Sequence, residues 1–121
     1  MNSLLDADTI LRYLLNDIPD QASETQQEID KGAFTIGEVI AEVVYVLQGV
    51  YQLGRKDICT ALTLFLDEIN IQDKPVLKDA LSEFENSSLD YVDCVLISRK
   101  KLLKDRILSF DKKLNKRLSQ V

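Results

Sequence analysis

The sequence contains no histidine, and this absence excludes several kinds of active site. Catalytic triads of the Ser-His-Asp and Cys-His types need an imidazole base, and many zinc sites use histidine ligands. Only four glycines are present, and they match neither the GxGxxG pattern nor the Walker loop of nucleotide-binding proteins. Any chemistry must therefore come from carboxylates, hydroxyls, amines or a bound metal ion.

Cysteines and long apolar runs are also scarce. The two cysteines, Cys59 and Cys94, form no CxxC pair, and each lies in an apolar helical pattern that predicts a buried, reduced thiol. No apolar run is long enough to span a bilayer, and the N-terminus lacks a basic region followed by an apolar stretch. We expect a single domain over residues 1–121 that is soluble, cytoplasmic and has no membrane partner.

The charge is distributed unevenly along the chain. The net charge is −5, yet residues 99–121 carry nine of the 15 basic residues and only two of the 20 acids. This basic tail favours two interpretations equally, a contact with a phosphate backbone or a solvated helix face that offsets the acidic body. The candidates for RNA contact are Arg12 near the N-terminus and Arg99, Lys100 and Lys112 in the tail.

Short apolar runs alternate with longer helical patterns. Strand candidates lie at residues 3–5, 33–36 and 106–109, with weaker ones at 69–71 and 85–89. Helices are expected at about residues 8–15, 20–30, 37–53, 55–66, 75–84, 90–103 and 111–118. This alternation predicts an α/β fold, a three-layer α/β/α domain with a short central parallel sheet flanked by helices.

Acidic residues follow the expected strands. Asp6 comes directly after the first strand, Glu42 lies one turn into the helix after the second, Asp93 opens a later helix, and Asp111 follows the last strand. In a parallel sheet these positions converge on one edge. Carboxylate oxygens suit Mg²⁺ or Mn²⁺, and such an ion can activate water for attack on a phosphodiester.

Each acid also has a structural interpretation. Asp8 is expected to be the N-cap of the first helix, and for this residue alone we favour that role. Asp90, three residues before Asp93, resembles a capping pattern, and Asp111 is placed to cap the last helix. Taken singly, the two interpretations are equally good, but acids after every expected strand together favour a metal site.

Four stretches of the chain resemble, in order, the four motifs of PIN domains, especially those of VapC-type toxins. They are LLDADTILRYLLND at 4–17, IGEVIAEVVYVL at 36–47, LDYVDCVLI at 89–97 and LSFDKKL at 108–114. The resemblance implies that Asp6, Glu42, Asp93 and Asp111 hold Mg²⁺ or Mn²⁺ and activate water to cut single-stranded RNA. It gives Ser109 the place of a supporting serine or threonine.

The resemblance also implies partners. VapC-type toxins are neutralised by a cognate VapB-like antitoxin, usually form homodimers, and meet DNA only indirectly, through the antitoxin. One departure concerns Asp8, which stands where the family commonly has asparagine. The extra carboxylate is either a further ligand or a source of crowding at the metal, and we count Asp8 and Asp90 as supporting residues.

Two other functions are open at this point. A receiver-like signalling module also binds Mg²⁺ through an acidic pair after its first strand, but it needs a strong central strand that ends in aspartate, and 69–73 is a weak candidate. A non-catalytic PIN scaffold would instead bind RNA or a partner protein through the basic tail.

Overall fold

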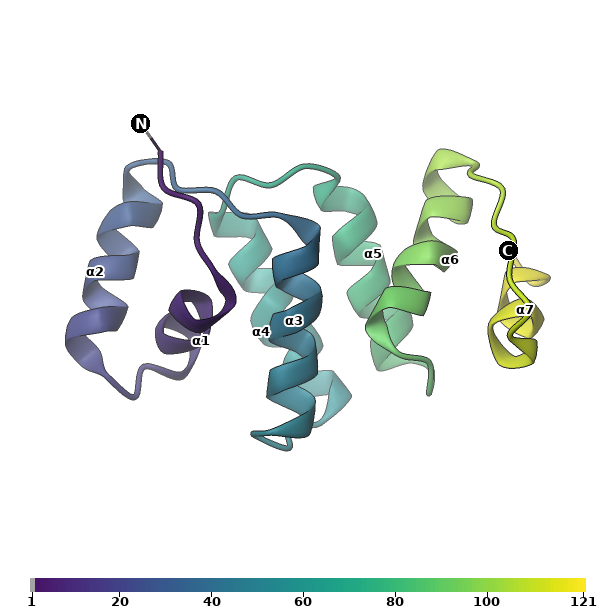
Figure 1. The fold of residues 1–121 in the computed structure, drawn as a ribbon, viewed down its shortest axis with the longest axis horizontal. Helices are drawn as coiled ribbons and strands as arrows, with labels where there is room; N and C mark the ends of the chain where they lie inside the picture. Colours follow the sequence, from purple (N-terminus) through teal and green to yellow (C-terminus); the bar gives the residue numbers. More distant parts are fainter. Residues whose placement is uncertain (1) are drawn as a thin grey trace. The chain divides into compact units, whose positions relative to one another are not determined.

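The computed structural model describes residues 2–121, in which seven helices are joined by short loops (Figure 1). The chain divides into two compact units, Met1–Gln72 and Asp73–Val121. Each unit has its own buried apolar residues, and each is described here by itself. The single domain expected from the sequence stays a prediction.

The first unit contains four helices: α1 (Ala7–Leu15), α2 (Pro19–Asp30), α3 (Gly37–Gly49) and α4 (Arg55–Glu68). Helix α1 packs against both α2 and α3, and α3 packs against α4. Buried side chains recur at helical spacing, for example Ile40, Val43, Val44 and Leu47 on α3. This spacing places one apolar stripe of α3 against its neighbours, so burial of that stripe stabilises the helix.

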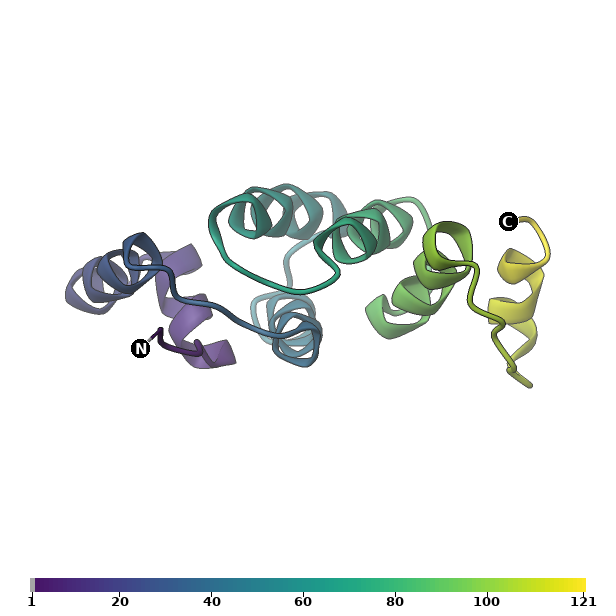
Figure 2. The same ribbon diagram turned by 90° about the horizontal axis from the view of Figure 1, so that it is seen from above.

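The second unit contains three helices: α5 (Lys74–Glu85), α6 (Tyr91–Leu103) and α7 (Lys112–Leu118). Helix α6 packs against α5 and also against α7, which Figure 2 shows at the C-terminal end of the chain. The Phe84 and Tyr91 rings meet edge to face with centroids 6.2 Å apart, which joins α5 to α6. Cys94 and Ile97 on α6 and Leu114 on α7 complete this core.

The predicted α/β fold with a central parallel sheet is wrong. Residues 2–121 contain no sheet, only two isolated parallel bridges, Leu4 with Phe34 and Phe34 with Asn70. Residues 106–109 form no strand, and residues 85–89 form the end of α5 and a turn. The helices that were expected to flank a sheet instead pack against one another.

The physical reason lies in the length and placement of the extended segments. Each bridged segment contributes a single residue, with Phe34 in both bridges, and parallel pairs are somewhat less stable per residue than antiparallel ones. Residues 106–110 have no strand to pair with among the described residues of their own unit. The sequence therefore supplies strand-like residues without enough paired backbone for a sheet.

The helix predictions are confirmed, with ends that differ by a few residues. Cys94 is buried and Cys59 half-buried, and both are free thiols, so the expected burial holds fully only for Cys94. No helix among residues 2–121 has both the length and the apolar character needed to cross a membrane.

Candidate active site

Three acidic residues lie at the starts of α6 and α7 in the second unit. Asp90 is the N-cap of α6, and its carboxylate accepts a hydrogen bond from the Asp93 backbone N–H at 2.9 Å. Burial raises the pKa of Asp93, and the negative charges of Asp90 and Asp111 raise it further. Asp93 is therefore a partly buried carboxylate whose ionised form is disfavoured, and a bound cation would oppose this effect.

A tight turn fixes Asp111 at the start of α7. The Asp111 backbone N–H donates to Ser109 Oγ at 3.0 Å, and its carboxylate caps α7 by accepting from the Leu114 N–H at 2.7 Å. Asn115 donates from its side-chain amide to the Ser109 carbonyl at 2.8 Å. Ser109 thus contacts the backbone of Asp111 directly, and its supporting role at a metal site stays a prediction. Sequence analysis did not predict Asn115, although its spacing of four residues from Asp111 was a signal.

Lys113 is the second residue that sequence analysis did not place in the site. Its Nζ donates to the Ser88 carbonyl at 3.0 Å, which connects the start of α7 to the loop before α6. The positive charge of Lys113 opposes the increase in the pKa of Asp93. One lysine thus joins the two helix ends and partly compensates the carboxylates there.

In the first unit, Asp6 is the N-cap of α1. Its carboxylate accepts from the Thr9 N–H at 2.9 Å, and this hydrogen bond lowers the pKa of Asp6. The prediction that Asp8 caps this helix is wrong, because the helix begins at Ala7 and its N-cap is Asp6, two residues earlier. Asp8 lies in the first turn of α1, exposed, with one carboxylate oxygen 3.6 Å from Arg12 Nε.

Glu42 lies on the exposed side of α3, next to the buried Val43. Asp6 and Glu42 belong to the first unit, whereas Asp93 and Asp111 belong to the second. Among residues 2–121, no three acidic or cysteine side chains stand close enough together to form a ready metal-binding group. The charges of Asp90 and Asp111 influence Asp93, but these residues form no ready metal-binding group, and the four-carboxylate site stays a prediction.

Several RNA-contact candidates already have partners within the protein. Arg12 pairs with Asp17 and donates to the Tyr51 hydroxyl at 2.9 Å. Arg99 Nε donates to Asp105 at 2.6 Å, and Lys100 Nζ donates to the Leu118 carbonyl at 2.7 Å. The fourth candidate, Lys112, is exposed at the first position of α7. Lys112 is therefore the most accessible of the four candidates.

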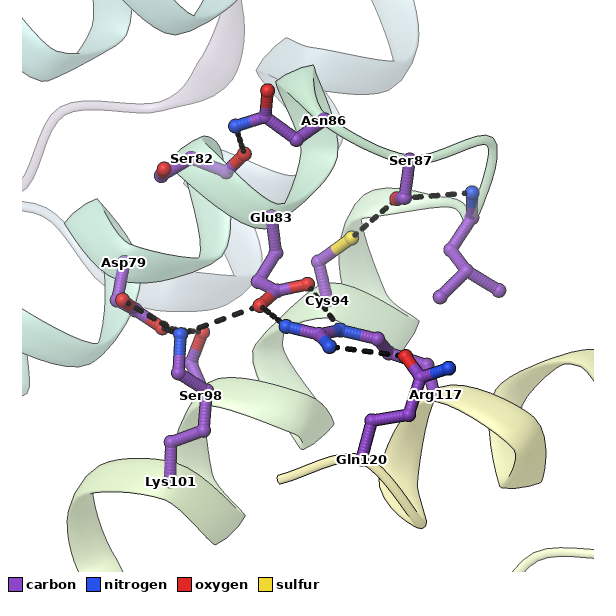
Figure 3. Close-up of polar contacts among 11 residues, drawn as sticks. Asp79, Ser82, Glu83, Asn86, Ser87, Cys94, Ser98, Lys101, Arg117 and Gln120 are labelled. Carbon is purple, nitrogen blue, oxygen red and sulfur yellow. Dashed lines mark hydrogen bonds and ion pairs between the residues drawn. The ribbon is translucent and has the colours of Figure 1, made fainter.

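Part of the basic tail neutralises buried acids. Arg117 donates to both oxygens of Glu83, and Lys101 lies 3.3 Å from the same carboxylate and 3.0 Å from that of Asp79, as Figure 3 shows. The Asp79 carboxylate also accepts from the Ser98 hydroxyl at 2.7 Å. These cations join α5 to α6 and α7, so they are neither a solvated face nor open for RNA.

The predicted ligands supply only carboxylate oxygens, which is the donor chemistry of Mg²⁺ and Mn²⁺. Burial and, to a smaller extent, the charges of Asp90 and Asp111 raise the pKa of Asp93, and a bound cation would oppose this increase. The residues present thus fit a hard divalent cation in their chemistry. Asp90 and Asp111 each use one oxygen in a helix cap and keep the other for a further contact.

Comparison with known proteins agrees with the four motifs. The family model described as PIN domain matches residues 3–117, so the chain belongs to the PIN domain family. The chain is also 29% identical over 122 residues to the VapC ribonuclease of Aquifex aeolicus (strain VF5), an alignment that covers 93% of this chain and 90% of that relative. No solved structure matches the chain. The resemblance inferred from the motifs is confirmed.

Proposed function

We propose that the protein is a metal-dependent endoribonuclease that cleaves single-stranded RNA and is the toxin of a toxin–antitoxin pair. The observation that carries this proposal is the family match over residues 3–117. Within the matched residues, Asp90 caps the helix on which Asp93 lies, and Asp111 caps the next helix. A relative named VapC ribonuclease, aligned over 93% of this chain, supports the choice of RNA as substrate.

In this proposal Asp6, Glu42, Asp93 and Asp111 hold Mg²⁺ or Mn²⁺. The bound ion would supply an activated water and stabilise negative charge on the scissile phosphate. The remaining residues position the ligands. Asp90 fixes the first turn of α6, on which Asp93 lies, through its hydrogen bond to the Asp93 N–H. Ser109 fixes Asp111 through the 3.0 Å bond from the Asp111 N–H.

The proposed partners follow from the same relationship. A VapB-like antitoxin would neutralise the nuclease in the cytoplasm, and DNA would be met only through that antitoxin. We also propose that the protein is a homodimer and that each chain is a single PIN domain.

The toxin role is tested by growth. Expression of the chain alone should arrest growth, and co-expression with the antitoxin encoded beside it should restore growth. Growth that continues normally during expression of the chain alone would refute the toxin role.

The site assignment is tested by RNA cleavage with purified variants. Asp93→Asn, Glu42→Gln, Asp6→Asn and Asp111→Asn should each lower cleavage of a single-stranded RNA at least about 100-fold, since each removes a charged metal ligand. Asp57→Asn, at an exposed acid in the first turn of α4, is the matched control and should cleave normally. Normal cleavage by Asp93→Asn would refute the proposed site.

Metal dependence is tested with a measurement that does not depend on activity. Mg²⁺ or Mn²⁺ should raise the thermal unfolding midpoint of the wild type, because an ion that binds only the folded state stabilises it. Asp93→Asn should reduce this increase, while Asp57→Asn should retain it. Cleavage that continues in EDTA would show that no divalent ion is needed and would contradict the proposal.

A further inference from the structure

A large aromatic side chain directly precedes Asp111 and faces the solvent. Phe110 is 92% exposed, and Leu108, two residues earlier, is 82% exposed. The residues between and before them, Ser109 and Ile107, are half-buried. The exposed Leu108 and Phe110 thus alternate with the half-buried Ile107 and Ser109, and both large apolar side chains face the solvent. Full exposure of neighbouring large apolar residues is unfavourable in water and marks a surface with a function in binding.

Hydrogen bonds of the residues next to Phe110 fix the backbone there, although the Phe110 side chain is exposed. Asp111 is fixed on one side through its hydrogen bonds with Ser109 Oγ and the Leu114 N–H. Ser109 is fixed on the other side by the Asn115 side chain. The backbone on both sides of the ring is therefore anchored, and a ligand that stacks on the ring pays little additional conformational entropy.

Basic residues flank Phe110 in the sequence. Arg106 and Lys112 are exposed on either side of it, four and two residues away, and Lys116 is exposed one turn further along α7. Proteins that bind single-stranded nucleic acid combine a positively charged path for the phosphates with aromatic side chains on which bases stack. The charge pattern fits a polyanion, and the ring fits the face of a base.

The geometry points to Phe110 as a stacking platform for a base of single-stranded RNA, next to Asp111, with Arg106 and Lys112 contacting the flanking phosphates. This inference rests on the proposed function, and it adds the surface that receives the substrate. Phe110 takes no part in the chemistry, and its role is to place the strand beside Asp111. We expect Phe110 to accept any of the four RNA bases, because every base has a face that can stack.

The chain contains no tryptophan, so Phe110→Trp introduces a single fluorescent reporter at the platform. Addition of a short single-stranded RNA in EDTA should quench its emission, because a stacked base contacts the indole ring. Leu64→Trp, at a position on α4 that is 62% exposed, is the matched control and should keep its emission unchanged. Unchanged emission of Phe110→Trp at saturating RNA would overturn the inference.

Affinity gives a second readout that does not depend on the reporter. Phe110→Ala should weaken binding of the RNA in EDTA about 5- to 100-fold, the usual effect of removing one base-stacking ring. Leu64→Ala should bind like the wild type. Lys112→Gln should lower the slope of log affinity against log salt by about 0.7, the loss of one phosphate contact on a single strand. Wild-type affinity of Phe110→Ala would overturn the inference.

Binding in EDTA separates this inference from the nuclease proposal. If the wild type cleaves no RNA in Mg²⁺ but RNA still quenches Phe110→Trp, the nuclease proposal fails and the stacking surface stands. If the wild type cleaves RNA and Phe110→Ala binds and cleaves equally well, the stacking surface alone fails. Quenching by a protein partner but not by RNA would assign this face to protein binding and would also overturn the inference.

Discussion

Arg117 donates two hydrogen bonds to the buried carboxylate of Glu83, at 2.6 and 3.0 Å, and thereby joins α7 to α5. The Glu83 side chain is 9% exposed and that of Arg117 is 33% exposed. A paired guanidinium and carboxylate share two parallel hydrogen bonds, which fixes geometry as well as charge. The pair is thus a structural element of the second unit and explains why the Arg117 side chain is only partly exposed.

Arg117→Ala should destabilise the protein by about 2–4 kcal/mol, because it leaves the Glu83 carboxylate buried with only Lys101 nearby. Urea unfolding measures this as a lower midpoint. Lys116→Ala is the control, since Lys116 is exposed on the same helix, and it should change the stability by less than about 0.5 kcal/mol. Equal midpoints for Arg117→Ala and the wild type would contradict the role of the ion pair.

The same pair predicts a dependence of stability on pH. The hydrogen bonds from Arg117 lower the pKa of Glu83 below its ordinary 4.5, against the opposing effect of burial. The folded protein therefore releases this proton at a lower pH than the unfolded chain does. The resulting stabilisation is fully present above pH 4.5 and is lost as the pH falls through the lowered value. Urea midpoints between pH 7 and pH 3 should fall less steeply for Glu83→Gln and for Arg117→Ala.

Asp93 has the opposite effect on stability. Its pKa is raised, first by burial and then by Asp90 and Asp111, so its ionised form is disfavoured in the folded protein. The folded state binds this proton more tightly than the unfolded chain, and stability falls as the pH rises through the pKa of Asp93. Asp93→Asn should therefore raise the unfolding midpoint at pH 7 without metal, while it abolishes cleavage. A lower midpoint would show that the carboxylate is stabilising and would refute this prediction.

Asp6 combines a helix cap with a proposed ligand, and two substitutions separate these roles. Asparagine is also a good N-cap, so Asp6→Asn should keep the bond from the Thr9 N–H and stay within about 0.5 kcal/mol of the wild type. Asp6→Ala should lose the cap and about 1 kcal/mol of stability. Both should lose cleavage. Active Asp6→Asn protein would assign Asp6 to the cap alone.

The helices were largely predictable because their signals are local. Apolar residues at helical spacing predicted α3, Pro75 predicted the start of α5, and Asp90 and Asp111 were correctly expected to cap helices. The cap of the first helix was misplaced by two residues, since Asp6 and Asp8 are both good caps and only the path of the backbone decides between them. Cap choice depends on the dihedral angles of the preceding residues, which the sequence does not reveal.

The sheet was wrongly predicted because strand pairing depends on partners far along the chain. The residues around Leu4, Phe34 and Asn70 do run parallel, yet each pairing stops at one bridge. The sequence pattern of Ile107 and Leu108 is strand-like, but no extended partner lies within the described residues of their unit. Apolar patterning thus indicated the bridged segments around Leu4, Phe34 and Asn70, was wrong for residues 85–89, and carried no information on the extent of pairing.

The candidate site was predictable in part. The motifs singled out Asp93 and Asp111, which lie near each other in the second unit, and Ser109, which contacts Asp111. Lys113 was counted only as part of the basic tail, because its contact with the Ser88 carbonyl depends on how α7 packs beside α6. Charge counts show how many cations a segment holds, but only packing shows which of them are already paired.

Asp6, Asp90 and Asp111 each begin a helix with the same carboxylate that lies in, or beside, the proposed site. At these positions the requirement for folding and the requirement for chemistry act on one side chain. A single change to asparagine satisfies the first requirement and removes the second. We therefore expect spontaneous escape from a harmful nuclease to occur repeatedly at these positions, through folded but inactive proteins rather than through truncated or aggregated ones.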